Sequence, residues 1–237
     1  MKINVIPYAA ATRPELTDGK TVVVIDVLRA TSVMITALAN GCREIIPVLN
    51  PEEAFQKALL FSPDEVVLGG ERQAEKITGF HVGNSPLEYT RQLVENKTVI
   101  MTTSNGTRAL NSCFNAKNIY IASFLNLQAM VEKLNPEEEV VLFCSGTNNS
   151  FSIDDGLCAA AIINGLSKET ELMLTDFAQL MLSVYSTNKE NREALLNKCY
   201  HLNLLKQKGY EKDVIFCLQN SLYDITPQMN LISKTIK

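Results

Sequence analysis

The sequence predicts an α/β fold, and three observations lead to that prediction. Six short apolar runs rich in Val and Ile recur between residues 21 and 144. Helical patterns of apolar residues lie between these runs, as in consecutive βαβ units. Clusters of polar residues follow several of the runs, at the strand ends where open α/β sheets bind ligands. We therefore expect a three-layer α/β/α arrangement with a largely parallel or mixed sheet, folded as a single domain over residues 1–237.

The apolar runs carry little polar alternation, which is typical of strands buried on both faces of a sheet. They are Thr21–Val27, Glu44–Leu49, Glu65–Leu68, Thr98–Thr102, Asn118–Ala122 and Glu139–Cys144.

The intervening segments predict helices, in part from their capping residues. Asn50, Pro51 and two acidic residues form a typical helix start, and Gly41 ends the helix before it. The predicted helices cover Ser32–Asn40, a segment from Asn50, Thr107–Phe114, Leu127–Leu134 and Asp154–Leu166. The last third, residues 171–237, is predicted to be helical, with helices at Asp176–Tyr185 and Asn191–Gln207 and at most one strand, at Val214–Cys217.

A faint internal repeat lies within the predicted sheet. Residues Ile45–Arg72 can be laid over Ile119–Gly146 at a constant offset of 74 residues. The similarity indicates either a duplication or simply two βαβ units of the same kind. A duplication would divide the chain into halves, residues 20–95 and 96–170, that share one cleft.

Composition narrows the classes of function. The net charge is −4, whereas nucleic-acid-binding proteins usually present a basic surface, so no nucleic-acid partner is expected. No apolar run reaches the about 18 residues of a membrane span, and the N-terminus lacks the apolar stretch of a signal peptide. The six cysteines form no CxxC pair, which is typical of reduced, buried thiols in a cytoplasmic protein.

Five polar turns follow predicted strands and hold the candidate site. In the first, Asp26 ends a strand, and Arg29, Thr31 and Ser32 follow at a helix start. A carboxylate there can bind a hard cation, and an Arg beside a helix N-terminus can bind phosphate. Asp26 could equally serve only as a helix cap.

The other four turns offer similar chemistry, each beside a purely structural alternative. Gly69–Arg72 either places a carboxylate and a guanidinium at a glycine-rich bend that can approach a ligand, or forms only a surface ion pair. Val82–Glu88 could bind a ligand or simply start a helix. Met101–Arg108 carries five hydroxyl or amide side chains around one glycine and is the most phosphate-like segment. Cys144–Asp155 ends in adjacent carboxylates that suit a helix start whatever their function.

These turns supply three sets of candidate residues. The catalytic candidates are Asp26, Arg29, Glu71 and Arg72. The substrate-binding candidates are Thr31, Ser32, Asn84, Ser85, Thr103, Asn105, Gly106, Thr107, Arg108, Gly146 and Thr147. The metal-ligand candidates are Asp26, Glu71, Asp154 and Asp155. Carboxylates without His or Cys partners suit Mg²⁺, which is therefore the expected cofactor.

Several familiar signatures are absent from the sequence. There is no GxxxxGK[ST] phosphate loop and no GxGxxG after a strand. Cys144 is not followed by Arg six residues on, and Asp26 is not followed by Asp two residues on. The usual cysteine-phosphatase and phosphoaspartate-phosphatase signatures therefore fail. His81 and His201 are the only histidines, too few for a histidine-rich zinc site, and we interpret His81 as a surface residue.

Five motifs occur in order along the chain, namely Val24–Ser32, Gly70–Arg72, Gly83–Pro86, Thr102–Thr107 and Cys144–Thr147. Together they resemble the 2-phosphosulfolactate phosphatase family, and the stretches Cys199–Gly209 and Asp213–Cys217 also resemble the family's C-terminal part. The resemblance covers nearly the whole chain. Departures occur at His81, where the family usually has an acidic residue, in the glycine-poor loop Gln73–Thr78, and at Asn148–Asn149.

The resemblance implies a magnesium-dependent phosphatase that hydrolyses 2-phospho-3-sulfolactate to 3-sulfolactate and phosphate, a step of coenzyme M biosynthesis in some organisms. That substrate carries phosphate, sulfonate and carboxylate groups and needs several cationic partners. We expect Mg²⁺, Arg29, Arg72 and Arg108 to supply them. Either a metal-bound water or the Asp26 carboxylate would attack phosphorus.

Two other classes of function stay open at the level of sequence. The chain could be a non-catalytic binding protein for a small phosphorylated or sulfonated acid. It could also act on another small phospho-acid, as a phosphatase, lyase or isomerase. The oligomeric state is open as well, a homodimer included.

Overall fold

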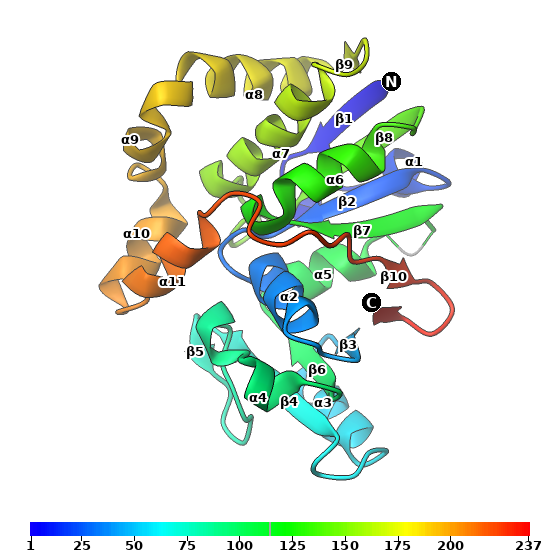
Figure 1. Ribbon diagram of the computed structural model, residues 1–237, viewed down its shortest axis with the longest axis vertical. Coiled ribbons are helices and arrows are strands. Elements are labelled where there is room, and N and C mark those ends of the chain that lie inside the picture. Colours follow the sequence, from blue (N-terminus) through cyan, green and yellow to red (C-terminus); the bar gives the residue numbers. More distant parts are fainter. Residues whose placement is uncertain (114) are drawn as a thin grey trace.

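The computed structural model describes residues 1–113 and 115–237 as an α/β protein with two sheets (Figure 1). The five-stranded sheet has the order β7-β2-β8-β1-β9, and all its strands are parallel. The six-stranded sheet has the order β10-β11-β3-β6-β4-β5, with a parallel centre and antiparallel edges. The α/β prediction is confirmed.

The strands account for every predicted apolar run. The five-stranded sheet contains β1 (Lys2–Ile6), β2 (Thr21–Ile25), β7 (Asn118–Ala122), β8 (Glu139–Cys144) and β9 (Met173–Leu174). The six-stranded sheet contains β3 (Glu44–Pro47), β4 (Val66–Arg72), β5 (Glu75–Lys76), β6 (Thr98–Thr102), β10 (Met229–Asn230) and β11 (Thr235–Ile236). Strand β1 and the two-residue strands were not predicted.

Two helices lie between the sheets, and others cover the outer faces. Helix α2 (Ala30–Ala39) contacts both β7 and β3, and α5 (Gly106–Asn111) contacts β2. Outside the five-stranded sheet lie α6 (Leu127–Leu134), α7 (Ile153–Leu166) and α8 (Asp176–Thr187); outside the other lies α3 (Pro51–Ala58). Each sheet is thus the middle of an α/β/α sandwich, and the two sandwiches share α2 and α5.

The capping prediction at Asn50 is confirmed, because its side-chain Oδ1 accepts a hydrogen bond from the Glu53 N–H at 2.8 Å. The predicted helix from Thr107 starts as α5, while its predicted end at Phe114 lies outside the described residues. The remaining short helices are α1 (Pro14–Thr17) and α4 (Arg91–Val94).

The last third is only partly helical and departs from the prediction in three ways. Strands β9, β10 and β11 lie in it, where at most one strand was expected. The single helix expected at Asn191–Gln207 is split into α9 (Arg192–Leu196) and α10 (Tyr200–Gln207). The strand suggested at Val214–Cys217 is wrong, because this segment belongs to α11 (Glu211–Cys217). Val214 and Cys217 are buried while Ile215 is 62% exposed, and this spacing of three fits one helical face rather than a strand.

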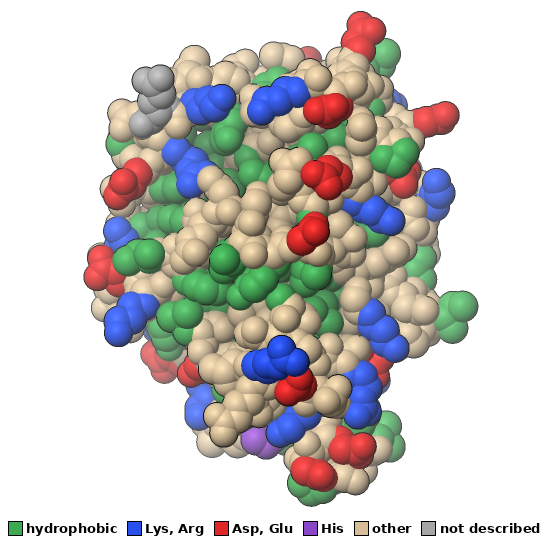
Figure 2. Space-filling view, in the orientation of Figure 1, with side chains coloured by type: hydrophobic (Ala, Val, Ile, Leu, Met, Phe, Trp, Pro, Cys, Tyr) green, Lys and Arg blue, Asp and Glu red, His purple; other side chains and the backbone are tan. Residues whose placement is uncertain are grey.

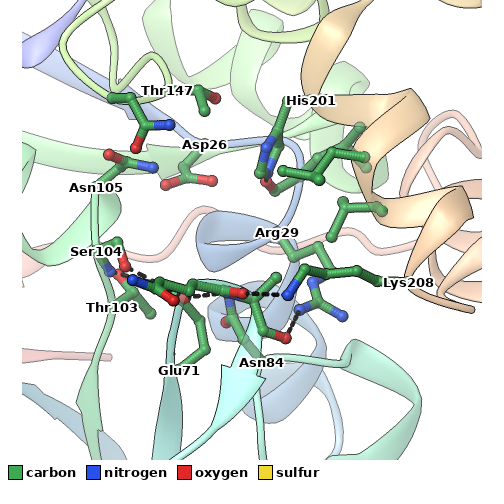
Figure 3. A pocket seen from close by; sticks show the side chains of 16 residues that line it. Asp26, Arg29, Glu71, Asn84, Thr103, Ser104, Asn105, Thr147, His201 and Lys208 are labelled. Atoms are coloured by element: carbon green, nitrogen blue, oxygen red, sulfur yellow. Dashed lines mark hydrogen bonds between the residues drawn. The ribbon is translucent and has the colours of Figure 1, made fainter.

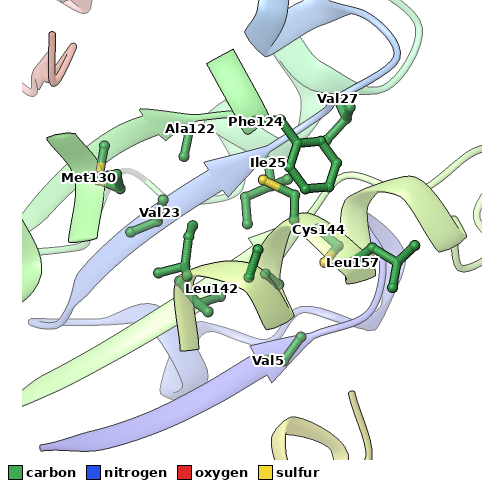
Figure 4. Close-up of a cluster of buried hydrophobic side chains, with 14 of the residues drawn as sticks. Val5, Val23, Ile25, Val27, Ala122, Phe124, Met130, Leu142, Cys144 and Leu157 are labelled. Carbon is green, nitrogen blue, oxygen red and sulfur yellow. The ribbon is translucent and has the colours of Figure 1, made fainter. Parts of the chain in front are cut away.

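The core follows from strand alternation. Val23 and Ile25 face the outer helices together with Leu142 and Cys144, and they share a cluster with Leu157 of α7, as Figure 4 shows. Their neighbours Val22 and Val24 face the opposite way and pack with the helices between the sheets. All six cysteines are buried and free, as predicted. Burial of the sheets on both faces explains why the strands read as continuous apolar runs.

Each of the two halves, residues 20–95 and 96–170, contributes one strand, β2 or β6, to the sheet that holds the other half's strands. Strand β2 precedes β3 in the chain, yet it pairs between β7 and β8, whereas β6 pairs between β3 and β4. Val22 lies opposite Ile119 and Val141, and Val99 lies opposite Ile45 and Val67. These partners differ by the 74 residues of the sequence repeat. The pairing register therefore follows the repeat, and a duplication stays a prediction.

The surface carries both signs of charge. Figure 2 shows Lys and Arg interspersed with Asp and Glu on one face, with no continuous basic surface on that face. Among the described residues, no helix combines the length and the apolar character that crossing a bilayer requires.

Candidate active site

A cleft of about 380 Å³ opens where strand ends from both sheets meet α10, a size typical of small-molecule sites. In Figure 3, Asp26, Asn105 and Thr147 lie on one side of this cleft, and Glu71 and Asn84 lie on the other. The cleft is lined by Asp26, Leu28, Arg29, Glu71, Gln73, Ala74, Asn84, Thr103, Ser104, Asn105, Thr147, Asn148, His201, Leu204, Leu205 and Lys208.

Asp26 follows β2 and is fixed by the start of α2. Its Oδ1 accepts the Ala30 N–H at 3.1 Å. The Thr31 hydroxyl donates to the Asp26 carbonyl at 2.8 Å and accepts the Asp26 N–H at 3.0 Å. The Ser32 hydroxyl donates to the Val27 carbonyl at 2.8 Å. Thr31 and Ser32 therefore hold this turn in shape and do not line the cleft, and the Leu28–Arg29 peptide bond within it is cis.

Burial changes the protonation of Asp26. The side chain is 7% exposed, and burial raises its pKa from 3.8 to about 7. The Ala30 hydrogen bond opposes this rise, and the negative charges of Asp154 and Glu71 add to it. Asp26 thus exchanges its proton near neutral pH, a property common in catalytic carboxyls.

Glu71 ends β4 and is tied to the turn after β6. Its Oε1 accepts the Ser104 N–H at 2.7 Å, and its Oε2 accepts the Ala74 N–H at 2.8 Å and the Ser104 hydroxyl at 3.2 Å. Arg72 lies outside the cleft, where its guanidinium donates to the Leu49 carbonyl and the Thr102 hydroxyl, both at 3.0 Å. The Glu71 carboxylate therefore lines the cleft, whereas the neighbouring Arg72 guanidinium bonds to residues outside it.

In the turn Thr103–Thr107, a threonine hydroxyl bonds to the backbone N–H and carbonyl of an earlier residue, as the Thr31 hydroxyl does at Asp26. The Thr107 hydroxyl donates to the Thr103 carbonyl at 2.9 Å and accepts the Thr103 N–H at 3.2 Å. A Cβ on Gly106 would lie 2.5 Å from the Ala30 Cβ and 2.8 Å from Asp26 Oδ2, so only glycine allows this close approach of the two helix starts. Asn105 lines the cleft, whereas Arg108 is exposed on α5 away from it.

Arg29 belongs to a buried network with a residue that the sequence did not suggest. Its Nη1 lies 2.6 Å from Asp213 Oδ2 on α11, its Nη2 donates to the Ala74 carbonyl at 3.3 Å, and its guanidinium lies 4.0 Å from the Tyr210 ring centroid. Asp213 also accepts the Ser85 hydroxyl at 2.7 Å. Ser85 therefore acts on Arg29 indirectly, by holding the carboxylate that pairs with it.

Asn84, beside this network, lines the cleft itself. Its buried Oδ1 has no hydrogen-bond partner among the described residues. A buried amide oxygen without a donor costs free energy, which a bound ligand or water would recover.

Asp154 and Asp155 open α7 behind the cleft and are both buried. Asp155 accepts the Val27 and Gly146 N–H groups, both at 2.9 Å, and so joins the ends of β2 and β8. Burial raises the pKa of Asp155 well above its ordinary value, and Asp154 adds to the rise. Burial also raises the pKa of Asp154, opposed by the nearby His201 and by the Cys199 thiol. Neither carboxyl lines the cleft, although Thr147 from the same turn does.

Helix α10 supplies cleft residues that were not predicted. His201, Leu204 and Leu205 of α10 and its C-cap residue Lys208 line the cleft at a spacing of three and four residues, which is one helical face. His201 Nε2 lies 2.8 Å from the Leu28 carbonyl; because a carbonyl only accepts, Nε2 carries the proton. The buried Nδ1 has no partner in the described part of the chain. The helical periodicity was visible in the sequence, but the surface that this face covers was not.

The cleft offers oxygen donors of the kind that a magnesium ion prefers. Within residues 1–113 and 115–237, no three His, Cys, Asp or Glu side chains are grouped to hold a metal. Mg²⁺ usually needs only one or two carboxylates, together with waters and substrate phosphate. Asp26 and Glu71 provide two in the cleft, and among the described residues only the Ala30 N–H bonds to the Asp26 carboxylate. The site fits such an ion and does not resemble an all-protein cage.

Comparisons with known proteins identify the family of the chain. Residues 6–231 match the profile of the family described as 2-phosphosulpholactate phosphatase. The chain belongs to this family. It is 50% identical to a protein of Clostridium perfringens (strain SM101 / Type A) over 228 residues, which are 95% of this chain and 92% of that protein. It is 43% identical to a protein of Clostridium novyi (strain NT) over 231 residues, 97% of each chain. Both relatives are named "Probable 2-phosphosulfolactate phosphatase".

Proposed function

We propose that this chain is a magnesium-dependent phosphatase that hydrolyses 2-phospho-3-sulfolactate to 3-sulfolactate and phosphate. The observation that carries the proposal is the meeting of Asp26, titrating near neutrality, with Glu71 and two amide side chains in one cleft. Membership of the family, over residues 6–231, supports this choice of substrate.

Substrate binding and proton transfer fall to different residues of the cleft. Asn84 and Asn105 can donate from their amides to phosphate oxygens. The ionised Asp26 can take a proton from a water that attacks phosphorus, while the bond from phosphorus to the ester oxygen breaks. The ester oxygen then takes a proton from solvent, and Asp26 returns its own proton to solvent. Its free oxygen could instead attack phosphorus directly and displace the ester oxygen, and water would then hydrolyse the aspartyl phosphate and regenerate the carboxylate. Both routes require the ionised carboxylate.

Asp26 and Glu71 would hold the magnesium ion. When bound, the ion would neutralise charge on the phosphate and polarise a water. The negative charges of Asp154 and Glu71 raise the pKa of Asp26. Three carboxyl groups close to one another support a cationic partner at this point.

The test is phosphate release from 2-phospho-3-sulfolactate, measured with Mg²⁺ and after chelation. Asp26→Asn and Glu71→Gln are expected to lower kcat/KM by about 100-fold or more. Glu52→Gln, an exposed glutamate on α3, is the matched control and should keep the wild-type rate. Near wild-type rates in both cleft variants would contradict the assignment.

The same assay addresses the alternatives. Tight binding of the phospho-acid without phosphate release in the presence of Mg²⁺ would favour a binding protein. Faster release from another small phospho-acid would change the substrate and keep the reaction. A role in coenzyme M biosynthesis, a cytoplasmic location and a homodimer stay predictions.

A further inference from the structure

The cleft contains fewer free cations than its substrate requires. Of the arginines expected to bind anionic groups, only Arg29 lines the cleft, because Arg72 and Arg108 lie outside it. Among the described lining residues, Lys208 is the other permanently charged cation. The proposed substrate carries a phosphate and two further anionic groups, a sulfonate and a carboxylate.

Arg29 is already neutralised by the protein. Its guanidinium forms a buried ion pair with Asp213 and also donates to the Ala74 carbonyl. Both members of the pair are nearly inaccessible, with side-chain exposures of 1% and 6%. Drawing Arg29 toward a ligand would leave Asp213 buried without its partner, which is strongly unfavourable.

Lys208 is held far less firmly. Its ammonium donates to the Gln73 carbonyl at 2.9 Å and to Glu75 Oε1 at 3.0 Å. The Glu75 side chain is 75% exposed, and ion pairs with such exposed partners contribute little stability. An anion in the cleft can therefore compete with Glu75 for the ammonium group.

Helix α10 sets Lys208 apart from the reacting end of the cleft. His201 lies at one end of the lining face, beside Leu28 and the Asp26 turn, and Lys208 lies at the other end, beside Gln73. Seven residues of helix rise by about 10 Å. Leu204 and Leu205 lie between them, and form an apolar wall that suits a short carbon frame. Figure 3 shows Lys208 on the side of the cleft with Asn84, away from Thr147.

We propose that Lys208 binds an anionic group of the substrate that is not transferred, the sulfonate or the carboxylate, and thereby determines specificity. This inference rests on the proposed function and assigns to α10 the choice among phosphate esters. When substrate binds, the ammonium exchanges Glu75 for the anionic group and keeps its hydrogen bond to Gln73.

The test compares two substrates and three variants. The substrates are 2-phospho-3-sulfolactate and 2-phospholactate, which lacks only the sulfonate. For the sulfonated substrate, Lys208→Met should raise KM about 10- to 100-fold with little change in kcat, the effect of losing one charge-assisted hydrogen bond. Lys208→Arg should recover part of the loss. The ammonium of Lys206 contacts Asn197 outside the cleft. Lys206→Met is therefore the matched control and should behave as wild type.

The substrate pattern identifies the group that is bound. A KM effect confined to the sulfonated ester assigns the sulfonate, and an equal effect on both esters assigns the carboxylate. Unchanged KM for both esters would overturn the proposal while the phosphatase assignment stands. If the wild type releases no phosphate, calorimetric titration with 3-sulfolactate decides instead. Weaker binding by Lys208→Met then supports the role of Lys208, and equal binding refutes it.

Discussion

Asp26→Asn is expected to stabilise the metal-free protein at neutral pH while it lowers kcat/KM about 100-fold or more. In the unfolded chain this carboxyl ionises at its ordinary pKa of 3.8, and in the folded protein burial raises the pKa to about 7. Between these values the unfolded chain releases a proton that the folded protein keeps, so folding stability falls as pH rises. The difference corresponds to about 4 kcal/mol, at about 1.4 kcal/mol per pKa unit, and is complete above pH 7 or so.

Asparagine avoids this cost, because it does not ionise and its amide oxygen can still accept the Ala30 N–H. In a chelator, thermal unfolding at about pH 8 should show the variant roughly 10 °C above wild type, with a smaller gap at about pH 5. Adding Mg²⁺ should raise the melting temperature of the wild type alone, since the ion would bind the folded, ionised site. A variant that melts at or below wild type at the higher pH would refute the reasoning.

Two further substitutions test the packing around the cleft. Gly106→Ala places a Cβ 2.8 Å from Asp26 Oδ2, so we expect a fall in kcat of at least about 10-fold and a stability loss of about 1–3 kcal/mol, measured by phosphate release and urea unfolding. Asp213→Ala leaves the Arg29 guanidinium buried without its counter-charge and should cost about 3–5 kcal/mol in urea unfolding. The double variant Arg29→Met/Asp213→Leu should recover much of that loss, and a double variant no more stable than Asp213→Ala would contradict the pairing.

Much of the fold and part of the site could be predicted because parallel strands impose simple rules. Strands buried on both faces must be apolar throughout, so the central strands of both sheets were visible as Val- and Ile-rich runs. Their carboxyl ends meet at common edges, which is why Asp26, Glu71, Asn105 and Thr147 converge on one cleft. Strand β1 (Lys2–Ile6) was missed because Asn4 interrupts its apolar residues.

Side-chain direction and long-range packing could not be predicted from local patterns. Glu71 and Arg72 are neighbours, yet one lines the cleft and the other bonds to Leu49 and Thr102 outside it, since successive strand residues point to opposite faces. Lys208 reaches the cleft only because α10 packs beside β5 and the Asp26 turn. Nothing near Lys208 in the sequence indicates that contact.

The exchange of strands between the sheets has a consequence for how the chain reaches its native state. Strand β2 has no parallel neighbours until β7 and β8 have been synthesised, so the centre of the five-stranded sheet cannot assemble before residue 144 is available. Contacts so distant in sequence slow folding and expose unpaired strand edges in the meantime. A chain cut between residues 95 and 96 should yield two pieces that are each unfolded alone and regain structure only when mixed, because β2 of the first piece pairs between β7 and β8 of the second, and β6 of the second pairs between β3 and β4 of the first.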